Sequence, residues 1–285
     1  MNSRIKFKCF SCQSEAVNVI ASLSKRIFSE GQYYILRCQT CSSTTTFPMP
    51  QLDLSYYENT FRVDDSSSHV DDFVLRYAKT LISQFRKITC SDPISILDVG
   101  CGNGDFLLAL KAIGINALGI DPSTVMVSNC CKKEVSALKS SIEEFSRFSD
   151  YDLIILNSVL EHVENPQEIV SKIINSVPPS TIVVFQQAIY SGLVPMVFRK
   201  SWYGWAPNEH FFHWTKSGFI RFLSSINITP VKTITRDLYY CWTPFSLSGY
   251  KSYLFFNLQF VVSRVARYFA LGDSGIFFIR GKKKI

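Results

Sequence analysis

Four of the nine cysteines form two identical pairs near the start of the chain. Each pair has the spacing Cys-x2-Cys, and 25 residues separate Cys9 and Cys12 from Cys38 and Cys41. Two turns with this spacing can bring four thiolates together tetrahedrally around Zn²⁺. A module of about 40 residues has too small a core to fold alone, so the metal would supply folding energy. We therefore expect structural zinc on these cysteines; the alternative is four free thiols in a reduced protein.

A second pattern that could bind a ligand is the glycine-rich turn Asp98-Val99-Gly100-Cys101-Gly102-Asn103-Gly104-Asp105. Glycine allows positive φ angles and lets a ligand approach the backbone closely. A dinucleotide-binding turn needs glycine five residues after the first one, where this chain has Asp105, so a nicotinamide-dependent oxidoreductase is disfavoured. The alternative without any ligand is a tight strand-to-helix connection in a structural α/β domain.

The charges around this turn indicate which chemical groups its ligand would carry. A bound group would meet the N-terminus of the following helix, which favours a carboxylate or phosphate. The nearby Asp98 and Asp105 suit a ligand that also carries positive charge. Asp121 follows the next predicted strand, where a carboxylate can bind both hydroxyls of a ribose. A ribose, an amino-acid group and a cation together match S-adenosylmethionine.

Alternating strands and helices must position these residues. After a predicted helix over residues 70–87, short apolar strands alternate with helical runs, which favours a parallel sheet covered by helices on both faces, a doubly wound α/β fold. The predicted strands are 94–99, 116–120, 136–139, 151–156 and 181–186, and the predicted helices are 106–113, 124–133 and 166–176.

Four segments carry a family resemblance. The run Ile96-Leu97-Asp98-Val99-Gly100-Cys101-Gly102-Asn103-Gly104, then Gly119-Ile120-Asp121-Pro122-Ser123, then Tyr151-Asp152-Leu153-Ile154 with Leu160-Glu161-His162-Val163, resembles class I S-adenosylmethionine-dependent methyltransferases. The resemblance implies a Rossmann-like fold with a mostly parallel seven-stranded sheet. The expected cofactor-binding residues are Asp98, Gly100, Cys101, Gly102, Asn103, Gly104, Asp121, Pro122, Ser141, Ile142, Asn157 and Ser158.

The resemblance also implies a role for several of these residues. The three glycines of the turn would line the methionine part of S-adenosylmethionine, and Asp121 would hold the ribose. Ser141 and Ile142 would flank the adenine, although many relatives have Asp at the position of Ser141. Asn157 and Ser158 would face the methionine or the methyl acceptor.

The methyl acceptor is expected to meet an aromatic segment, residues 201–216, which contains three tryptophans and two histidines. It resembles the acceptor-side insert of the same methyltransferases, which carries a Pro-x-Glu-His sequence. His210 is the first candidate for the base that removes an acceptor proton, His213 the second and His162 the third. The alternatives are that the rings complete a hydrophobic core and that Glu161-His162 fixes a helix end, which is the favoured interpretation of that pair.

Composition and charge bound the function further. With 285 residues, 47% hydrophobic and 19% charged, the chain can bury a large core, which excludes disordered, collagen-like and small disulfide-rich proteins. Residues 190–285 contain 13 Lys or Arg and 3 Asp or Glu, while the rest contains 17 and 20. The last third is therefore near +10. Its basic residues are dispersed among aromatic rings, so nucleic acid is an unlikely partner.

The apolar residues between Leu254 and Phe269 fall on one side of a helical wheel and basic or polar residues on the other. Such a helix either caps a domain or lies on an anionic membrane surface, with Lys282-Lys283-Lys284 adding attraction. The N-terminus lacks the apolar stretch of a secretory signal. We expect a cytoplasmic protein, with peripheral contact at the inner membrane surface as the alternative to a domain cap.

Four regions are expected along the chain: a zinc-ribbon-like module (1–50), a connector with a leading helix (51–93), the cofactor-binding α/β core (94–190), and a part with the acceptor-side insert, basic helix and closing strands (191–285). The predicted function is O-methylation of a glycan, lipid-linked sugar or other small molecule by S-adenosylmethionine. The alternative is a zinc-containing module that binds nucleic acid or protein on a non-catalytic α/β scaffold. Nothing in the sequence predicts the oligomeric state.

Overall fold

The computed structural model falls into two compact units built from segments that are far apart in sequence. The first contains Met1–Gln51, Leu160–Glu164 and Gln187–Ile276, and the second contains Leu52–Val159, Asn165–Gln186 and Phe277–Ile285. The structure describes residues 8–24 without 11 and 13, 32–51, 58, 70–236, 258, 261–262, 265–266, 269 and 271–282. Most of the predicted connector and basic helix, and Lys283 and Lys284, lie outside the described residues.

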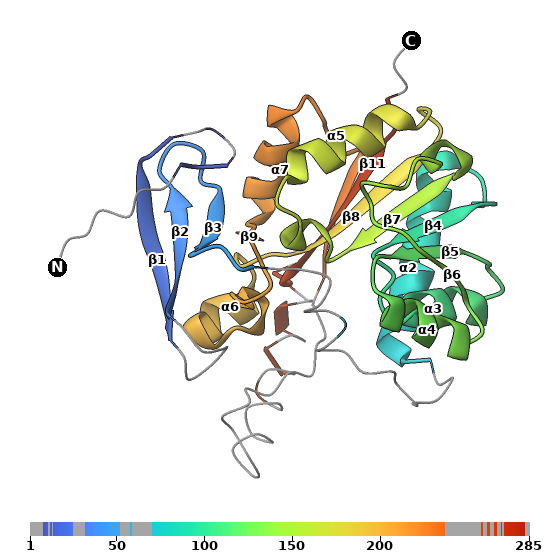
Figure 1. The fold of residues 1–285 in the computed structure, drawn as a ribbon, viewed down its shortest axis with the longest axis horizontal. Helices are drawn as coiled ribbons and strands as arrows, with labels where there is room; N and C mark the ends of the chain where they lie inside the picture. Colours follow the sequence, from blue (N-terminus) through green and yellow to red (C-terminus); the bar gives the residue numbers. More distant parts are fainter. Residues whose placement is uncertain are drawn as a thin grey trace. The chain divides into compact units, whose positions relative to one another are not determined.

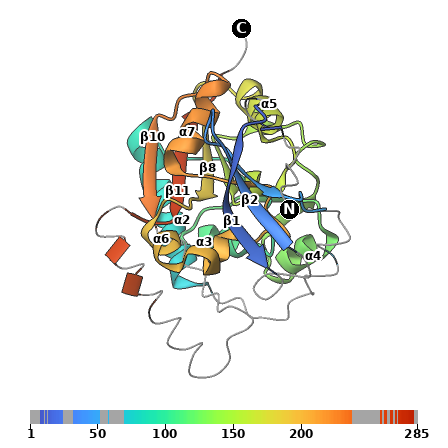
Figure 2. The same ribbon diagram turned by 90° about the vertical axis from the view of Figure 1, so that its left-hand side faces the viewer.

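The first unit contains a four-stranded sheet. Its strand order is β1 (Val17–Ser24), β2 (Gln32–Cys38), β3 (Thr44–Phe47) and β9 (Phe212–His213), and neighbouring strands are antiparallel. Figure 2 shows β1 and β2 side by side. Because β9 joins the edge of β3, the cysteine-rich segment and the histidine-rich segment belong to one sheet.

Buried aromatic rings hold the first unit together. One cluster joins Leu23 of β1 and Ile35 of β2 to Val194, Trp202 and Trp205. These three residues belong to α6 (Leu193–Phe198) and the turns that follow it. A second group packs Trp214 on two phenylalanines of α7 (Lys216–Ser225), with ring centroids 5.1 and 4.9 Å away. The aromatic segment therefore forms core, as its alternative interpretation expected.

The second sheet has seven strands, as the resemblance implied. Its strand order is β10 (Lys232–Arg236), β11 (Ser274–Arg280), β8 (Ile182–Ala188), β7 (Leu153–Asn157), β4 (Ile96–Val99), β5 (Leu118–Asp121) and β6 (Ser136–Lys139). The strands from β8 to β6 pair in parallel. The central strands β4 and β7 are nearly all buried, as expected for a parallel sheet covered on both faces.

Helices connect the strands of the second unit. They are α2 (Asp72–Thr89), α3 (Asp105–Ala112), α4 (Thr124–Lys132) and α5 (Pro166–Ser176). Helix α4 contacts β5 and β6, and α2 contacts α3 (Figure 1). The start of α4 is fixed by the Ser123 hydroxyl, which accepts from the N–H of Met126. The doubly wound α/β fold is thus confirmed.

None of the helices in the described parts of the chain combines the length and apolar character needed to cross a membrane.

Candidate functional site

The glycine turn joins β4 to α3 and has three glycines in the left-handed region. Their φ angles are +68° at Gly100, +52° at Gly102 and +77° at Gly104. A Cβ on Gly100 would lie 2.7 Å from Val159, and one on Gly104 would lie 2.8 Å from the sulfur of Cys130. A Cβ on Gly102 would meet nothing within 4 Å. Two of the glycines thus allow close packing, and the third leaves open space where a ligand can approach the backbone.

Asp121, at the end of β5, ties the turn to the neighbouring strand. Its Oδ2 accepts from the N–H of Gly102 at 3.0 Å, and its Oδ1 accepts from the N–H of Ser123, across Pro122, at 2.9 Å. Burial raises the pKa of Asp121, while these two N–H groups act in the opposite direction. Each carboxylate oxygen still has acceptor capacity, so Asp121 can bind ribose hydroxyls while it holds the turn.

Asp98 is the buried acid on β4 at the start of the turn, and 1% of its surface is exposed. Its Oδ1 has no hydrogen-bond partner among the described residues. Burial, together with the charge of Asp121, raises the pKa of Asp98 to about 8. A buried oxygen without a donor is costly, and a cationic ligand would both supply the donor and favour the ionised form. The site therefore fits a positively charged group such as S-adenosylmethionine carries.

Contacts from α4 brace the rest of the turn. The Asn103 side chain accepts from Asn129 at 2.6 Å, and the thiol of Cys130 donates to the carbonyl of Gly102 at 3.3 Å. The sulfur of Cys101 lies 4.0 Å from that of Cys130. Cys101 and Asn103 thus shape the turn through their side chains and can offer backbone groups to a ligand.

Polar residues also gather at the end of β7. Asn157 accepts from the Tyr77 hydroxyl, and the Ser158 hydroxyl donates to the side chain of Gln186 at 3.0 Å. Ser158 has a φ of +52°, an uncommon value for a residue with a side chain. Sequence reasoning missed Tyr77 and Gln186. Tyr77 was counted only as an apolar helix position, and only its hydroxyl could have hinted at a polar role.

Ser141 and Ile142 lie in a turn after β6. The Ser141 hydroxyl accepts from the N–H of Glu144, and the Glu144 carboxylate accepts from the N–H of Ser141, both at 3.2 Å. This reciprocal pair is a capping box. Ile142 is buried, and its carbonyl accepts from Lys172 at 3.1 Å. Ser141 therefore stabilises its own turn, which is a local reason for serine here. The adenine contact remains a prediction.

The three candidate bases belong to the first unit and form a chain of rings. The centroids of His162 and His210 lie 4.7 Å apart, and those of His210 and His213 lie 6.1 Å apart. Burial lowers the pKa of His162 to about 4, and burial with the charge of His162 lowers that of His210 to about 3. Burial, followed by the charge of His210, also takes the pKa of His213 well below 6.5. All three rings are therefore neutral at pH 7, and burial also makes each a weaker base than a free imidazole.

Hydrogen bonds engage one ring nitrogen of His210 and one of His213. Nδ1 of His210 lies 3.0 Å from the carbonyl of Gly204, so it donates and leaves a lone pair on Nε2. Nε2 of His213 lies 2.8 Å from the hydroxyl of Thr46. Glu161, His162 and His210 also place ligand atoms within 4.8 Å of one another, so this group could hold a divalent cation. The sequence interpretation of Glu161-His162 as a helix-end pair did not anticipate this cluster.

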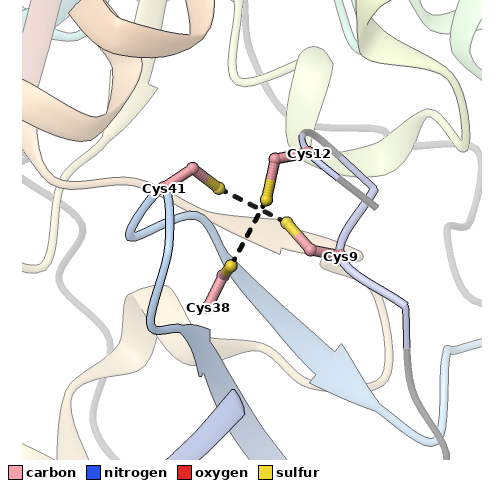
Figure 3. A group of neighbouring side chains, drawn as sticks. All are labelled: Cys9, Cys12, Cys38 and Cys41. Carbon is pink, nitrogen blue, oxygen red and sulfur yellow. Dashed lines mark hydrogen bonds between the residues drawn. The ribbon is translucent and has the colours of Figure 1, made fainter. Parts of the chain in front are cut away.

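The four cysteines converge as predicted (Figure 3). The sulfurs of Cys9 and Cys41 lie 3.4 Å apart, those of Cys12 and Cys38 lie 3.5 Å apart, and all four fall within 4.8 Å of one another. With Zn–S bonds of about 2.3 Å, tetrahedral geometry requires sulfurs about 3.8 Å apart. The arrangement fits one zinc ion. Four protein ligands would leave no open position for catalysis.

Comparison with known proteins assigns the family. Residues 70–233 match the family described as "Methyltransferase domain". The chain belongs to this methyltransferase family. The matched range contains the glycine turn, Asp121 and all three histidines, while the four cysteines precede it.

Individual relatives agree with the family. The chain is 29% identical to a ubiquinone biosynthesis O-methyltransferase of Rickettsia conorii over 187 residues, 61% of this chain and 60% of that protein. It is 34% identical to the Rickettsia felis protein of the same name over 130 residues, 41% of this chain and 52% of that protein. The chain thus spans between half and two thirds of these relatives.

Solved structures share the fold. A plantazolicin methyltransferase in complex with a substrate analogue and SAH (S-adenosylhomocysteine) has a TM-score of 0.52 and 19% identity, covering 80% of this chain and 88% of its own. Magnesium protoporphyrin IX methyltransferase from Synechocystis PCC 6803 with bound SAH has a TM-score of 0.51 and 13% identity, covering 81% and 100%.

The Asp121 carboxylate predicts a selective effect on affinity. Asp121→Asn should weaken S-adenosylhomocysteine binding at least about tenfold, because hydrogen bonds to a charged group contribute about 1.5–3 kcal/mol. Asp152→Asn is the matched control. Asp152 lies just before β7, at the opposite end of the strands from Asp121, and its carboxylate accepts from the N–H groups of Ile94 and Ser95. Equilibrium dialysis measures both. Equal affinities for the two variants would mean that Asp121 does not bind the ribose.

Asp98 predicts proton release on binding. Without ligand, its pKa of about 8 lies above the ordinary 3.8, so its contribution to stability is greatest at low pH and falls as pH rises from about 4 to about 8. A cationic ligand favours the ionised form, so S-adenosylmethionine should expel a proton below pH 8 and bind more tightly as pH rises. Calorimetry near pH 7 in two buffers of different ionisation enthalpy counts the proton. Asp98→Asn should abolish the release; an unchanged count in that variant would refute this assignment.

The cysteine cluster predicts metal stoichiometry. Reduced protein should retain about one zinc per chain after dialysis, and Cys41→Ser should lose most of it because a structural site needs all four thiolates. Cys131→Ser removes an exposed cysteine outside the cluster and should keep the metal. Elemental analysis by mass spectrometry distinguishes the three proteins. A metal-free wild type with intact thiols would eliminate the zinc site.

Proposed function

We propose that this protein is an enzyme that transfers a methyl group from S-adenosylmethionine to an oxygen of a small molecule. The observation that carries the proposal is the buried Oδ1 of Asp98, which has no hydrogen-bond partner among the described residues and lies near Asp121 and a glycine turn with open space at Gly102. The methyltransferase family, the O-methyltransferases among the relatives and the SAH-bound neighbours in fold support it.

The acids at the ends of β4 and β5 would bind the cofactor, and a histidine would act on the acceptor. Asp98 would pair with the positive charge of the bound cofactor, and Asp121 would hold its ribose. The cofactor supplies an electrophilic methyl group on a sulfonium. The remaining requirement is an acceptor oxygen held in line with that methyl, with a base to take its proton. We assign this role to His210 because the hydrogen bond from its Nδ1 to Gly204 leaves a lone pair on Nε2. That bond raises the pKa of the ring, while burial lowers it and weakens the base.

We further propose that the acceptor is a sugar or lipid-linked sugar hydroxyl. The four-cysteine module on this methyltransferase core is the supporting feature, by resemblance to enzymes that modify glycans. The rings of Trp202, Trp205 and Trp214 are buried in the first unit, so these three do not provide an exposed stacking surface for the sugar. Recognition of the sugar would then depend on hydrogen bonds from polar groups of the protein.

Labelled methyl transfer tests the proposed function. With radiolabelled S-adenosylmethionine and a fractionated cell extract, label should enter the small-molecule fraction as an acid-stable methyl ether. Partition between organic and aqueous phases then separates lipid-linked from free acceptors. His210→Gln should reduce transfer by about 10²–10⁴-fold and leave cofactor affinity within twofold. Label found only in protein or nucleic acid would refute the small-molecule acceptor. No transfer despite cofactor binding would favour the binding-module alternative.

We also propose peripheral contact with an anionic membrane on the cytoplasmic side. Four described residues of the predicted basic helix are exposed apolar side chains at helical spacing: Leu258 (53%), Val261 (56%), Val265 (44%) and Phe269 (64%). Ala266 is buried and Val262 packs on the Trp202 cluster, so this segment has an apolar side that faces inward and another that faces solvent. The excess of basic residues in the last third of the chain favours an anionic lipid surface.

Vesicle binding tests the membrane contact. Val261→Glu should reduce cosedimentation with phosphatidylserine-containing vesicles several-fold, because it puts a negative charge on the exposed apolar side. Val231→Glu is the control, since Val231 has a similar exposure of 47% and lies outside this segment. Equal losses in both variants, or no binding by the wild type, would refute the contact.

A further inference from the structure

Strand β3 presents three consecutive buried threonines to the segment that carries the candidate bases. The exposed fractions of Thr44, Thr45 and Thr46 are 0%, 2% and 0%. The hydroxyls of Thr45 and Thr46 have partners in this segment, and that of Thr44 contacts Tyr190. The Thr44 hydroxyl lies 2.8 Å from that of Tyr190, and the Thr45 hydroxyl donates to the carbonyl of Phe211 at 2.7 Å.

Thr46 contacts two of the candidate bases at once. Its hydroxyl donates to the backbone carbonyl of His210 at 2.7 Å and lies 2.8 Å from Nε2 of His213. Its N–H also donates to the carbonyl of Phe211 at 3.0 Å. The strand pairing itself places Thr44 opposite His213. One side chain therefore fixes the backbone of the first candidate and the ring of the second.

The single hydroxyl proton of Thr46 orders this network. When that proton goes to the His210 carbonyl, Thr46 can only accept from His213, and His213 then carries its proton on Nε2. The His213 ring also has a hydrogen bond to the backbone of Gly204, so these two partners compete for its single proton. In the Nε2–H tautomer, Nε2 of His213 cannot take a proton from an acceptor. His210 has the complementary arrangement, with Nδ1 donating to Gly204 and the lone pair on Nε2.

The cysteine cluster leads directly into this strand. Only Ser42 and Ser43 separate Cys41 from Thr44. The Cys38 N–H donates to the Ser43 carbonyl at 2.8 Å, and the Cys41 thiol donates to the Ser43 hydroxyl at 3.2 Å. From the other cysteine pair, the ring of Phe10 packs on that of Phe212 with centroids 4.0 Å apart. The segments that carry the two cysteine pairs thus contact β3 and β9.

We propose that Thr46 is a positioning residue that makes His210 the base. It would do so by holding the backbone of His210 and by keeping His213 as the Nε2–H tautomer. This inference rests on the proposed function, in which His210 accepts the proton. It distinguishes two histidines that sequence alone left as alternatives, through a threonine on the strand that follows Cys41.

The test compares three substitutions in the full-length, zinc-loaded protein. Thr46→Val removes the hydroxyl at nearly constant volume, and Thr46→Ser retains it. Thr45→Val is the matched control, because it removes a buried hydroxyl-to-carbonyl bond one residue away that involves no histidine. Since the chain has four histidines, nitrogen-detected NMR of the imidazoles can follow each ring and its tautomer. S-adenosylhomocysteine affinity is measured in parallel.

In the wild type, His213 should carry its proton on Nε2 and His210 on Nδ1. Thr46→Val should lose the single His213 tautomer and shift the His210 signals, with cofactor affinity within twofold of wild type, while Thr46→Ser and Thr45→Val should resemble the wild type. The inference fails if His213 carries its proton on Nδ1, if Thr46→Val leaves both rings unchanged, or if Thr45→Val perturbs them equally. Failure of the wild type to bind S-adenosylhomocysteine would instead refute the proposed function, whatever the imidazole spectra show.

Discussion

The bond from the Gly102 N–H to the Asp121 carboxylate is the contact on which the proposed cofactor site depends. It joins the loop after β4 to the end of β5, and Asp121 is held in turn by the N–H of Ser123 at the start of α4. Two parallel neighbouring strands and two helix starts are thereby fixed around one buried carboxylate. Without this contact, the left-handed glycines would have no fixed relation to the ribose-binding acid.

The same contact explains the electrostatics of the site. Asp121 is a buried charge stabilised by two backbone donors, and its proximity contributes to the raised pKa of Asp98. Within the described residues, Asp121 thus has two N–H donors, while Oδ1 of Asp98 has none. A cation satisfies the second acid, which is a physical reason for a sulfonium-bearing or ammonium-bearing ligand rather than a neutral nucleoside.

Local patterns in the sequence were sufficient for the second unit. The glycine spacing, Asp121 after a short apolar strand and the alternation of strands and helices predicted the parallel sheet and the turn, because each depends on residues close together in the chain. The cysteine spacing predicted the convergence of four sulfurs for the same reason. Tyr77 on Asn157 was not predictable in this way, since it joins positions 80 residues apart.

The first unit depended on contacts that no local pattern encodes. Thr46 and His213 are 167 residues apart, and nothing in a run of threonines indicates which segment will pair with it. The aromatic segment has the same composition whether it is exposed for binding or buried, and the structure buries it because α6, α7 and the β1–β2 pair supply apolar partners. The Glu161, His162 and His210 cluster likewise requires the chain to bring distant residues together.

The most direct test of the central claim is calorimetric titration of the zinc-loaded protein with S-adenosylhomocysteine, with NAD in a parallel experiment. Saturable binding of one S-adenosylhomocysteine per chain and no binding of NAD is the predicted result, because the turn has Asp105 where a dinucleotide site needs glycine. Binding of NAD would contradict the proposed cofactor site and favour a dinucleotide-dependent enzyme. Binding of neither ligand would also contradict it and would leave the α/β unit as a non-catalytic scaffold.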